Sequence, residues 1–242
     1  MNNMQYPAYS APLVECRSLT KEYVAGFPIL NNMNFTVGRG RIVGLLGPNG
    51  SGKTTLIKLM AGLLVPNSGE ILINGSEVGI ETKQIVSYLP ERPYFSDGMT
   101  VNNTIDFFAD FYSDFDRNKA YEMLSRLGVP AKARMRTLSK GTKEKVQLIL
   151  VMSRRAQLYI LDEPIGGVDP AARDYILDTI ISNYAGGSTV LLSTHLIYDI
   201  ERVLQDVLFI SNGQIIVQAT SEQIRRDQNK SVDEFFREVF RC

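Results

Sequence analysis

Residues 42–54 of this chain read IVGLLGPNGSGKT, and this stretch decides the fold class. Its first part is apolar and typical of a short buried strand, while residues 47–54 match the pattern G-x-x-x-x-G-K-[ST] and precede a helix-like segment. In such a loop the glycines let successive backbone N–H groups turn toward phosphate oxygens, and the helix dipole adds partial positive charge there. The stretch therefore predicts a phosphate-binding loop between a strand and a helix, rather than a glycine-rich turn that only connects them.

The candidate nucleotide-binding residues of this loop lie in one short segment and are Gly47, Pro48, Asn49, Gly50, Ser51, Gly52, Lys53, Thr54 and Thr55. We expect Lys53 to reach the β- and γ-phosphates, which also makes it a candidate catalytic residue. Thr54 is expected to bind Mg²⁺ through its hydroxyl. Thr55 lies where it can contact the α-phosphate.

Strand-like and helix-like segments alternate over most of the chain. The expected strands are 14–16, 35–37, 41–46, 71–73, 85–89, 158–161, 189–192, 207–210 and 214–217, and the expected helices are 56–63, 104–112, 117–127, 139–155, 171–184 and 197–205. This alternation implies a mostly parallel core sheet covered on both faces, with an antiparallel β subdomain near the N-terminus. The sequence predicts an α/β fold with an inserted helical lobe at about residues 91–140.

The length of 242 residues suits one large domain, or one domain with a lobe inserted. We expect a flexible N-terminal arm at 1–12, a core domain at 13–220 and a C-terminal helical tail at 221–242. The tail is expected to form one or two amphipathic helices, and its alternating charges near 233–241 favour a solvated face.

Composition and charge argue against several classes of protein. The chain is 44% hydrophobic and 21% charged, which is ordinary for a globular protein and argues against disorder or a coiled coil. Lys+Arg and Asp+Glu both number 26, so the zero net charge gives no support to a nucleic-acid partner.

Cys16 and Cys242 define no disulfide framework, which favours a reducing compartment. No apolar run approaches the roughly 18 residues that span a bilayer, and the N-terminus lacks the pattern of a secretory signal. Any link to a membrane is therefore expected to go through a partner.

A second candidate site follows the apolar run 158–161, where Asp162 and Glu163 stand at the end of an expected strand. Ligands of open α/β sheets bind at the carboxyl ends of the strands. Asp162 is placed to hold the water shell of Mg²⁺, and Glu163 to polarise the water that attacks the γ-phosphate. Alone, such a pair could also be solvated acids that cap a strand, but the phosphate-binding loop favours the catalytic interpretation.

Several further segments occur in a fixed order along the chain, and they are Leu138-Ser139-Lys140-Gly141-Thr142, Asp162-Glu163-Pro164, Gly167-Val168-Asp169 and Ser193-Thr194-His195. Together with the phosphate-binding loop they resemble the motif set of the ATP-binding cassette (ABC) ATPases, over roughly residues 13–220. The resemblance implies a P-loop NTPase fold and an ATPase activity that uses ATP and Mg²⁺.

The resemblance also assigns roles to residues outside the loop. Tyr23 looks like the aromatic residue on which adenine stacks, although it could be an ordinary strand tyrosine. Ser139 and Gly141 would bind the γ-phosphate held by a second subunit, so that each ATP lies between two chains. Asp169 is similar to the residue that couples the two sites, and His195, the single histidine of the chain, to a switch histidine that contacts the γ-phosphate and is a candidate catalytic residue.

This chain departs from the family pattern at three points. Glu91 stands where the family has a glutamine that binds Mg²⁺, and its charged carboxylate could still bind the metal. Lys140 and Thr142 replace a glycine and a glutamine of the signature segment, and residues 166–169 read GGVD instead of the commoner SALD type. None of these changes removes a group that hydrolysis requires.

The resemblance implies partners on other chains. We expect a membrane-spanning transporter subunit, a second copy or a related ATPase subunit, and a place on the cytoplasmic face of the cell membrane. The amino-acid sequences of these motifs look most like those of exporter subunits. The alternatives are a non-transport ABC-type ATPase without a membrane partner and a small-molecule kinase, which would not need the signature segment. The aromatic residues at 94–115 either pack the helical lobe or line a groove for a short helix of the membrane subunit.

Overall fold

A computed structural model describes residues 11–91, 95–96, 98–166, 170–183 and 187–240. Its strands are β1 Val14–Val24, β2 Phe27–Val37, β3 Ile42–Leu46, β4 Ser68–Ile73, β5 Ser76–Glu77, β6 Val86–Leu89, β7 Leu158–Asp162, β8 Thr189–Ser193, β9 Asp206–Ser211 and β10 Gln214–Thr220. Its α-helices are α1 Lys53–Met60, α2 Ile80–Ile85, α3 Val101–Phe111, α4 Arg117–Arg126, α5 Lys140–Met152, α6 Pro170–Asn183, α7 Ile197–Ile200, α8 Ser221–Gln228 and α9 Val232–Phe240.

The core of the molecule is a six-stranded sheet in the order β10-β9-β3-β8-β7-β6. Strands β9, β3, β8, β7 and β6 are parallel, and only β10 pairs antiparallel, with β9. Every residue of β3, β7 and β8 is buried, as expected for strands covered on both faces. The prediction of an α/β fold with a mostly parallel core sheet is confirmed.

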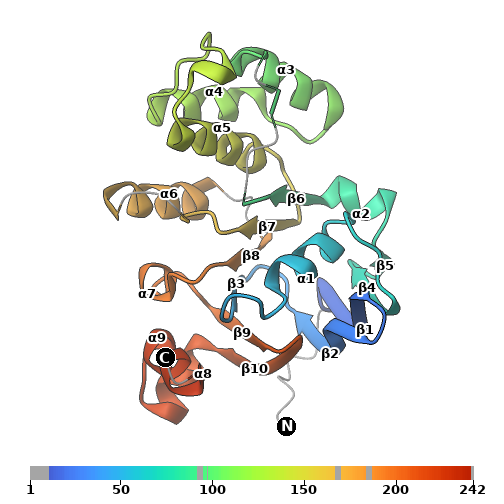
Figure 1. Cartoon of the computed structure of the whole chain (residues 1–242). Helices are drawn as coiled ribbons and strands as arrows, with labels where there is room; N and C mark the ends of the chain where they lie inside the picture. Colours follow the sequence, from blue (N-terminus) through green and yellow to red (C-terminus); the bar gives the residue numbers. More distant parts are fainter. Residues whose placement is uncertain (1–10, 92–94, 97, 167–169, 184–186, 241–242) are drawn as a thin grey trace.

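A smaller antiparallel sheet in the order β2-β1-β4-β5 lies beside the core sheet (Figure 1). Its strands β1 and β2 are much longer than the short runs expected from the sequence, and their pairing shifts register at several points. The polar residues between these shifts hide the alternation that normally marks a strand. Strand β5 and helix α2 were not predicted.

Helix α1 lies between the two sheets and buries its apolar side chains there (Figure 1). Leu56, Ile57, Leu59 and Met60 are each at most 1% exposed. Burying four such side chains contributes roughly 6–12 kcal/mol before the entropy of ordering is subtracted. This packing fixes the phosphate-binding loop, because the loop connects β3 directly to α1.

Helices α3, α4 and α5 gather at one end of the molecule (Figure 1). Each begins with a side-chain cap, from Thr100, Asp116 and Ser139 respectively. Helix α5 ends at Met152 rather than near Arg155, because Arg154 turns inward and donates to the backbone oxygens of Gln84 and Val86.

The helix predicted at 197–205 is shorter than expected, since α7 ends at Ile200. The following residues form tight turns, with Val203 N donating to Ile200 O and Leu204 N to Glu201 O. Gln205 then joins the core sheet, because its N–H donates to Ile42 O. Pairing with the sheet therefore ends the helix before its amphipathic pattern does.

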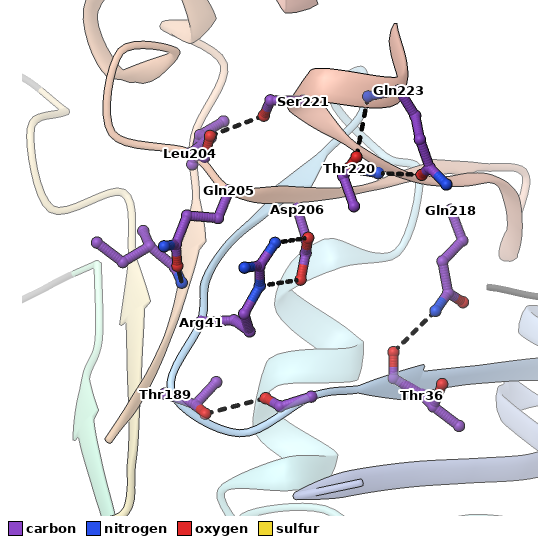
Figure 2. Close-up of polar contacts among 12 residues, drawn as sticks. Thr36, Arg41, Thr189, Leu204, Gln205, Asp206, Gln218, Thr220, Ser221 and Gln223 are labelled. Atoms are coloured by element: carbon purple, nitrogen blue, oxygen red, sulfur yellow. Dashed lines mark hydrogen bonds and ion pairs between the residues drawn. The ribbon is translucent and has the colours of Figure 1, made fainter. Parts of the chain in front are cut away.

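The amino end of the core sheet carries a compact polar cluster, drawn in Figure 2. Arg41 donates from Nη2 and Nε to the two carboxylate oxygens of Asp206, at 2.6 and 2.9 Å. The Asp206 side chain is 3% exposed and that of Arg41 34%. The pair joins the first residue of β9 to the residue before β3, so it closes this end of two adjacent strands.

The C-terminal tail forms the two helices α8 and α9, and it packs against the core sheet. Ser221 Oγ donates to Leu204 O at 2.7 Å, which holds the start of α8 (Figure 2). The rings of Phe235, Phe236 and Phe240 lie 5.4–6.1 Å from the ring of Phe209, measured between centroids. Only part of α9 faces solvent, because its aromatic face extends the core.

Candidate functional site

The phosphate-binding loop is held in place by close contacts of its glycines. At Gly47 an added Cβ would lie 2.3 Å from Ile210 O, and at Gly52 it would lie 2.7 Å from Leu30 Cδ2. Gly52 also has a φ of 108°, a left-handed conformation that side chains disfavour, and it is the N-cap of α1. The motif glycines are therefore required by the fold as well as by a ligand.

Lys53 lies at the base of this loop and is 8% exposed. Its ammonium donates to Gly47 O at 2.7 Å and to Pro48 O at 3.0 Å. Burial lowers the pKa of Lys53, while the nearby carboxylates of Glu163 and Asp162 act in the opposite direction. A desolvated cation at this point is suited to bind a polyphosphate.

Asp162 is the last residue of β7 and is buried, at 2% exposed. Its Oδ1 accepts a 2.5 Å hydrogen bond from Ser193 Oγ at the end of β8, whereas its Oδ2 has no partner among the residues that the structure describes. Burial raises the pKa of Asp162, and the neighbouring Glu163 adds to this shift. A buried carboxylate with a free oxygen is suited to a cation or its bound water.

Glu163 follows Asp162 with a φ of 50°, an uncommon value for a residue with a side chain. This conformation turns its carboxylate toward the segment after β8. Thr194 Oγ1 donates to Glu163 Oε2 at 3.0 Å, and His195 Nδ1 lies 3.1 Å from both carboxylate oxygens. The three side chains meet because β7 and β8 are adjacent parallel strands with Asp162 opposite Ser193.

Tyr23 lies beside the loop, with its Oη 3.4 Å from Thr55 Oγ1. The residue is 58% exposed, and Lys21 Nζ lies 5.7 Å from the centroid of its ring. An exposed ring beside a phosphate-binding loop is a suitable platform for stacking a base. The sequence did not mark Ile29, which lines the same cavity near Tyr23.

A single cavity of about 910 Å³ brings most of the predicted residues together. Those that line it are Tyr23, Asn49, Gly50, Gly52, Lys53, Thr54, Thr55, Glu91, Asp162, Glu163 and His195. Gly47, Pro48 and Ser51 belong to the loop beneath it, and Asp169 lies outside the described residues. Lys140, Glu144 and Gly166 also line the cavity but were not predicted as site residues. Lys140 and Gly166 belong to segments that the motif comparison singled out, whereas Glu144 lies outside every motif.

Ser139 and Gly141 do not line this cavity and are exposed at the start of α5. Ser139 Oγ accepts from Thr142 N at 3.2 Å and contacts Thr142 Oγ1 at 2.8 Å, so the threonine that departs from the family pattern supports the cap. Helix α5 also reaches the Glu91 segment, since Gln147 Nε2 donates to Pro90 O at 3.0 Å. An exposed helix N-terminus is open to an anion from another molecule.

The residues of the cavity fit Mg²⁺ bound together with a nucleotide. Asp162 offers the free oxygen described above, and the hydroxyl of Thr54 lies in the same cavity. Among the described residues there is no cluster of three or more His, Cys, Asp or Glu side chains that would hold a metal alone. Magnesium suits such a place, because it typically takes one or two carboxylates plus phosphate oxygens and water.

A second cavity, of about 820 Å³, lies between the core and the helical end and is lined mainly by apolar side chains. Phe108, Phe111 and Tyr112 contribute to it from α3 and its C-terminal end. Phe111 is 69% exposed, whereas Phe108 is 7% exposed and packs in the core. Phe108 therefore packs inside the molecule, as one interpretation expects, whereas Phe111 is exposed at the cavity. Tyr94 lies outside the described residues.

Comparisons with known proteins identify the family of this chain. Residues 30–166 match the sequence profile of the family described as "ABC transporter". This chain belongs to the ABC transporter family. It is 33% identical over 206 residues to the ABC transporter ATP-binding protein YtrB of Bacillus subtilis, covering 84% of this chain and 70% of YtrB.

Other ABC transporter proteins support the same assignment. The SkfA peptide export ATP-binding protein SkfE of Bacillus subtilis is 32% identical over 210 residues, covering 84% of this chain and 87% of SkfE. A solved structure of an ATP-binding subunit of an ABC transporter superposes with a TM-score of 0.85 at 32% identity, covering 94% of this chain and 99% of that one. The chain is therefore an ATP-binding subunit and an ATPase of P-loop NTPase fold with a single cassette. No helix among its described residues is long and apolar enough to cross a membrane.

Proposed function

We propose that this chain hydrolyses MgATP at the carboxyl end of its core sheet and so powers an ABC transporter that exports its substrate. The observation that carries the proposal is the meeting of Lys53, Asp162 and Glu163 around one cavity. A phosphate-binding cation, a candidate metal ligand and a general base are the groups that phosphoryl transfer to water requires.

In this mechanism the chain mainly positions its substrate and stabilises charge. Lys53 holds the β- and γ-phosphates, with the loop amides and the α1 dipole as further positive groups. Glu163 orients and polarises the attacking water, and His195 contacts the γ-phosphate. Tyr23 stacks on the adenine, and Thr55 contacts the α-phosphate.

Thr54, Asp162 and Glu91 would hold Mg²⁺, which supplies positive charge to the phosphate oxygens when it is bound. The free Oδ2 of Asp162 supports this assignment. Because burial raises the pKa of Asp162, a nearby cation would also offset the cost of keeping that carboxylate charged.

Two such subunits, either two copies or this chain with a related one, would close over ATP. Ser139 and Gly141 of each chain would then contact the γ-phosphate held by the other, and Asp169 would couple the two sites. The exposure of Ser139 and Gly141 at the start of α5 supports this arrangement, since both residues are accessible to a second chain. For the chain itself we propose an arm at 1–12, an ATPase domain at 13–220 with a lobe near 91–140, and a tail at 221–242.

The membrane subunit, on a separate chain, would dock in the apolar cavity beside Phe111 and Tyr112. Lys58 and Lys83 also line that cavity, so a short amphipathic helix with acidic side chains is the matching partner. This docking would hold the chain on the cytoplasmic face of the cell membrane. SkfE, which its name assigns to peptide export, supports the export direction and a transport role over a non-transport ATPase.

The experiment that tests the proposal is recovery of the tagged Glu163→Gln chain from native membranes, solubilised gently with MgATP present, followed by mass spectrometry. A multi-span membrane protein at stoichiometric yield is expected, and its recovery should fall when Lys58→Glu and Lys83→Glu are added. Lys132→Glu, an exposed charge reversal away from the cavity, is the matched control. Recovery of ribosomal or other non-membrane partners alone would contradict the transport role.

A further inference from the structure

We infer that Thr194 is a positioning residue for hydrolysis, whose buried hydroxyl holds the Glu163 carboxylate in the orientation that activates water. This inference rests on the proposed function, because it takes the role of Glu163 as given. Neither the family motif nor the cavity marks Thr194 as a site residue, since it does not line the cavity.

The hydrogen bonds of Thr194 fix the direction of its hydroxyl proton. Leu196 N donates to Thr194 Oγ1 at 3.0 Å, and Thr194 Oγ1 lies 3.0 Å from Glu163 Oε2. An ionised carboxylate can only accept, and the backbone N–H can only donate. The hydroxyl proton therefore points at Glu163 and orients its carboxylate.

Thr194 is a more rigid partner for this carboxylate than His195. Thr194 is 1% exposed and directly follows β8, whereas the His195 side chain is 55% exposed. The backbone of Glu163 is tied to the same place, since Glu163 N donates to Ser193 O at 3.0 Å. The backbone N–H and the carboxylate of Glu163 are thus both hydrogen-bonded to residues 193–194, which restricts rotation of the carboxylate.

The expected consequence is an effect on turnover with little effect on ATP binding. Thr194 does not line the cavity, so its substitution acts on the substrate through the residues that it holds, of which Glu163 is bonded to its hydroxyl. A charge-assisted hydrogen bond in a buried setting is stronger than one in water, and its loss would let the carboxylate adopt other orientations.

Thr189 offers a matched control at the other end of the same strand. Its hydroxyl donates to Gly38 O at 3.0 Å (Figure 2). It also accepts from Gly40 N at 3.0 Å, and the residue is 0% exposed. Valine removes one donated and one accepted hydrogen bond at either position. Only Thr194 is bonded to Glu163, so the pair separates positioning from loss of stability.

The experiment compares the steady-state ATPase of Thr194→Val, Thr194→Ser and Thr189→Val. Thr194→Val should lower kcat by about 10- to 100-fold and change KM by less than about threefold, as expected when a transition-state interaction is lost. Thr194→Ser, which keeps the hydroxyl, should restore most of kcat. Thr189→Val should lower the melting temperature about as much as Thr194→Val while keeping kcat. Thr194→Ala replaces the valine variant if that variant does not fold.

The same substitution in a Glu163→Gln background shows whether Thr194 acts through Glu163. Thr194→Val should then cause no further loss, because the carboxylate that it positions is gone. A wild-type kcat in Thr194→Val, or an equal loss in both backgrounds, would overturn the inference and leave the role of Glu163 intact. Undiminished turnover in Glu163→Gln alone would instead overturn the role of Glu163, and with it this inference.

Discussion

The two ends of the core sheet differ in whether their buried polar atoms have hydrogen-bond partners. At the amino end the buried side chains are paired, as in the Arg41–Asp206 ion pair (Figure 2) and the two hydrogen bonds of Thr189. At the carboxyl end Asp162 Oδ2 and Ser51 Oγ have no partner within the described part of the chain. Asn102 Oδ1 is the third buried side-chain atom without a partner among the described residues, and it lies at the start of α3, outside the core sheet. The amino end thus serves stability, and the carboxyl end keeps groups available for a ligand.

The carboxyl end also carries the strain and the unfavourable burial of charge. Glu163 has a φ of 50°, and burial shifts the pKa values of Asp162 upward and of Lys53 downward, each toward its neutral form. Such features cost folding free energy and are concentrated where chemistry needs them. The packed strands between the two ends supply the stability that tolerates them.

The largest effect that would sharpen this comparison is expected for Asp162→Asn. Turnover should fall on the order of 1,000-fold, because a charged group at the reacting phosphates is lost. The free energy of unfolding should stay the same or rise, since a raised pKa means that the charged carboxylate opposes folding at neutral pH. ATPase assays and urea unfolding would measure both. A clear destabilisation by Asp162→Asn would remove the contrast between the ends.

Asp206→Asn at the amino end should have the opposite effect, which is a loss of stability without a loss of turnover. It should lower the free energy of unfolding by about 3 kcal/mol, toward the lower end for a broken buried pair because Arg41 is partly exposed. The Kd for MgATP and the turnover at a temperature below the transition should remain at the wild-type values. A large loss of turnover in the folded variant would show that the two ends are not separate in function.

Ser139→Arg concerns the exposed start of α5 and should act on the dimer. It should weaken ATP-dependent dimerisation by at least about tenfold, the cost of one lost charge-assisted hydrogen bond, and leave ATP binding by the monomer unchanged. Analytical ultracentrifugation with and without MgATP, in the Glu163→Gln background, would measure this. An equal loss of both kinds of binding would contradict the arrangement of two chains over one ATP.

The smallest effect is expected for Thr220→Ala at the start of α8. Thr220 and Gln223 form a capping box, in which Gln223 N donates to Thr220 Oγ1 and Thr220 N to Gln223 Oε1 (Figure 2). Loss of this cap should lower the free energy of unfolding by about 1 kcal/mol, with turnover unchanged. Thermal unfolding would measure the shift, and no shift at all would mean that α8 contributes little to the amino end.

The sequence predicts local features of this fold better than contacts between distant residues. Residues 42–54 specify the strand, loop and helix, because each fixed position answers a local geometric need. The Arg41–Asp206 pair joins residues 165 positions apart, and no local pattern signals it. The early end of α7 has the same origin, since Gln205 is taken up by the core sheet.

The residues of the site also fall into those that a local sequence pattern predicts and those that only the folded sheet brings together. The acids after β7 could be predicted, since an apolar strand that ends in two carboxylates is a local pattern. The contact of Thr194 with Glu163 depends on β7 and β8 being neighbours with Asp162 opposite Ser193. That register is a property of the folded sheet, so the sequence places Thr194 in a motif without predicting its contact with Glu163.

The most direct test of the account is a comparison of single-turnover hydrolysis and MgATP binding in the wild-type and Glu163→Gln chains. The account predicts a turnover at least about 100-fold lower in the variant, the usual contribution of a general base, with a Kd for MgATP close to that of the wild type. Hydrolysis at the wild-type rate by Glu163→Gln would contradict the assignment of catalysis to the carboxyl end of β7.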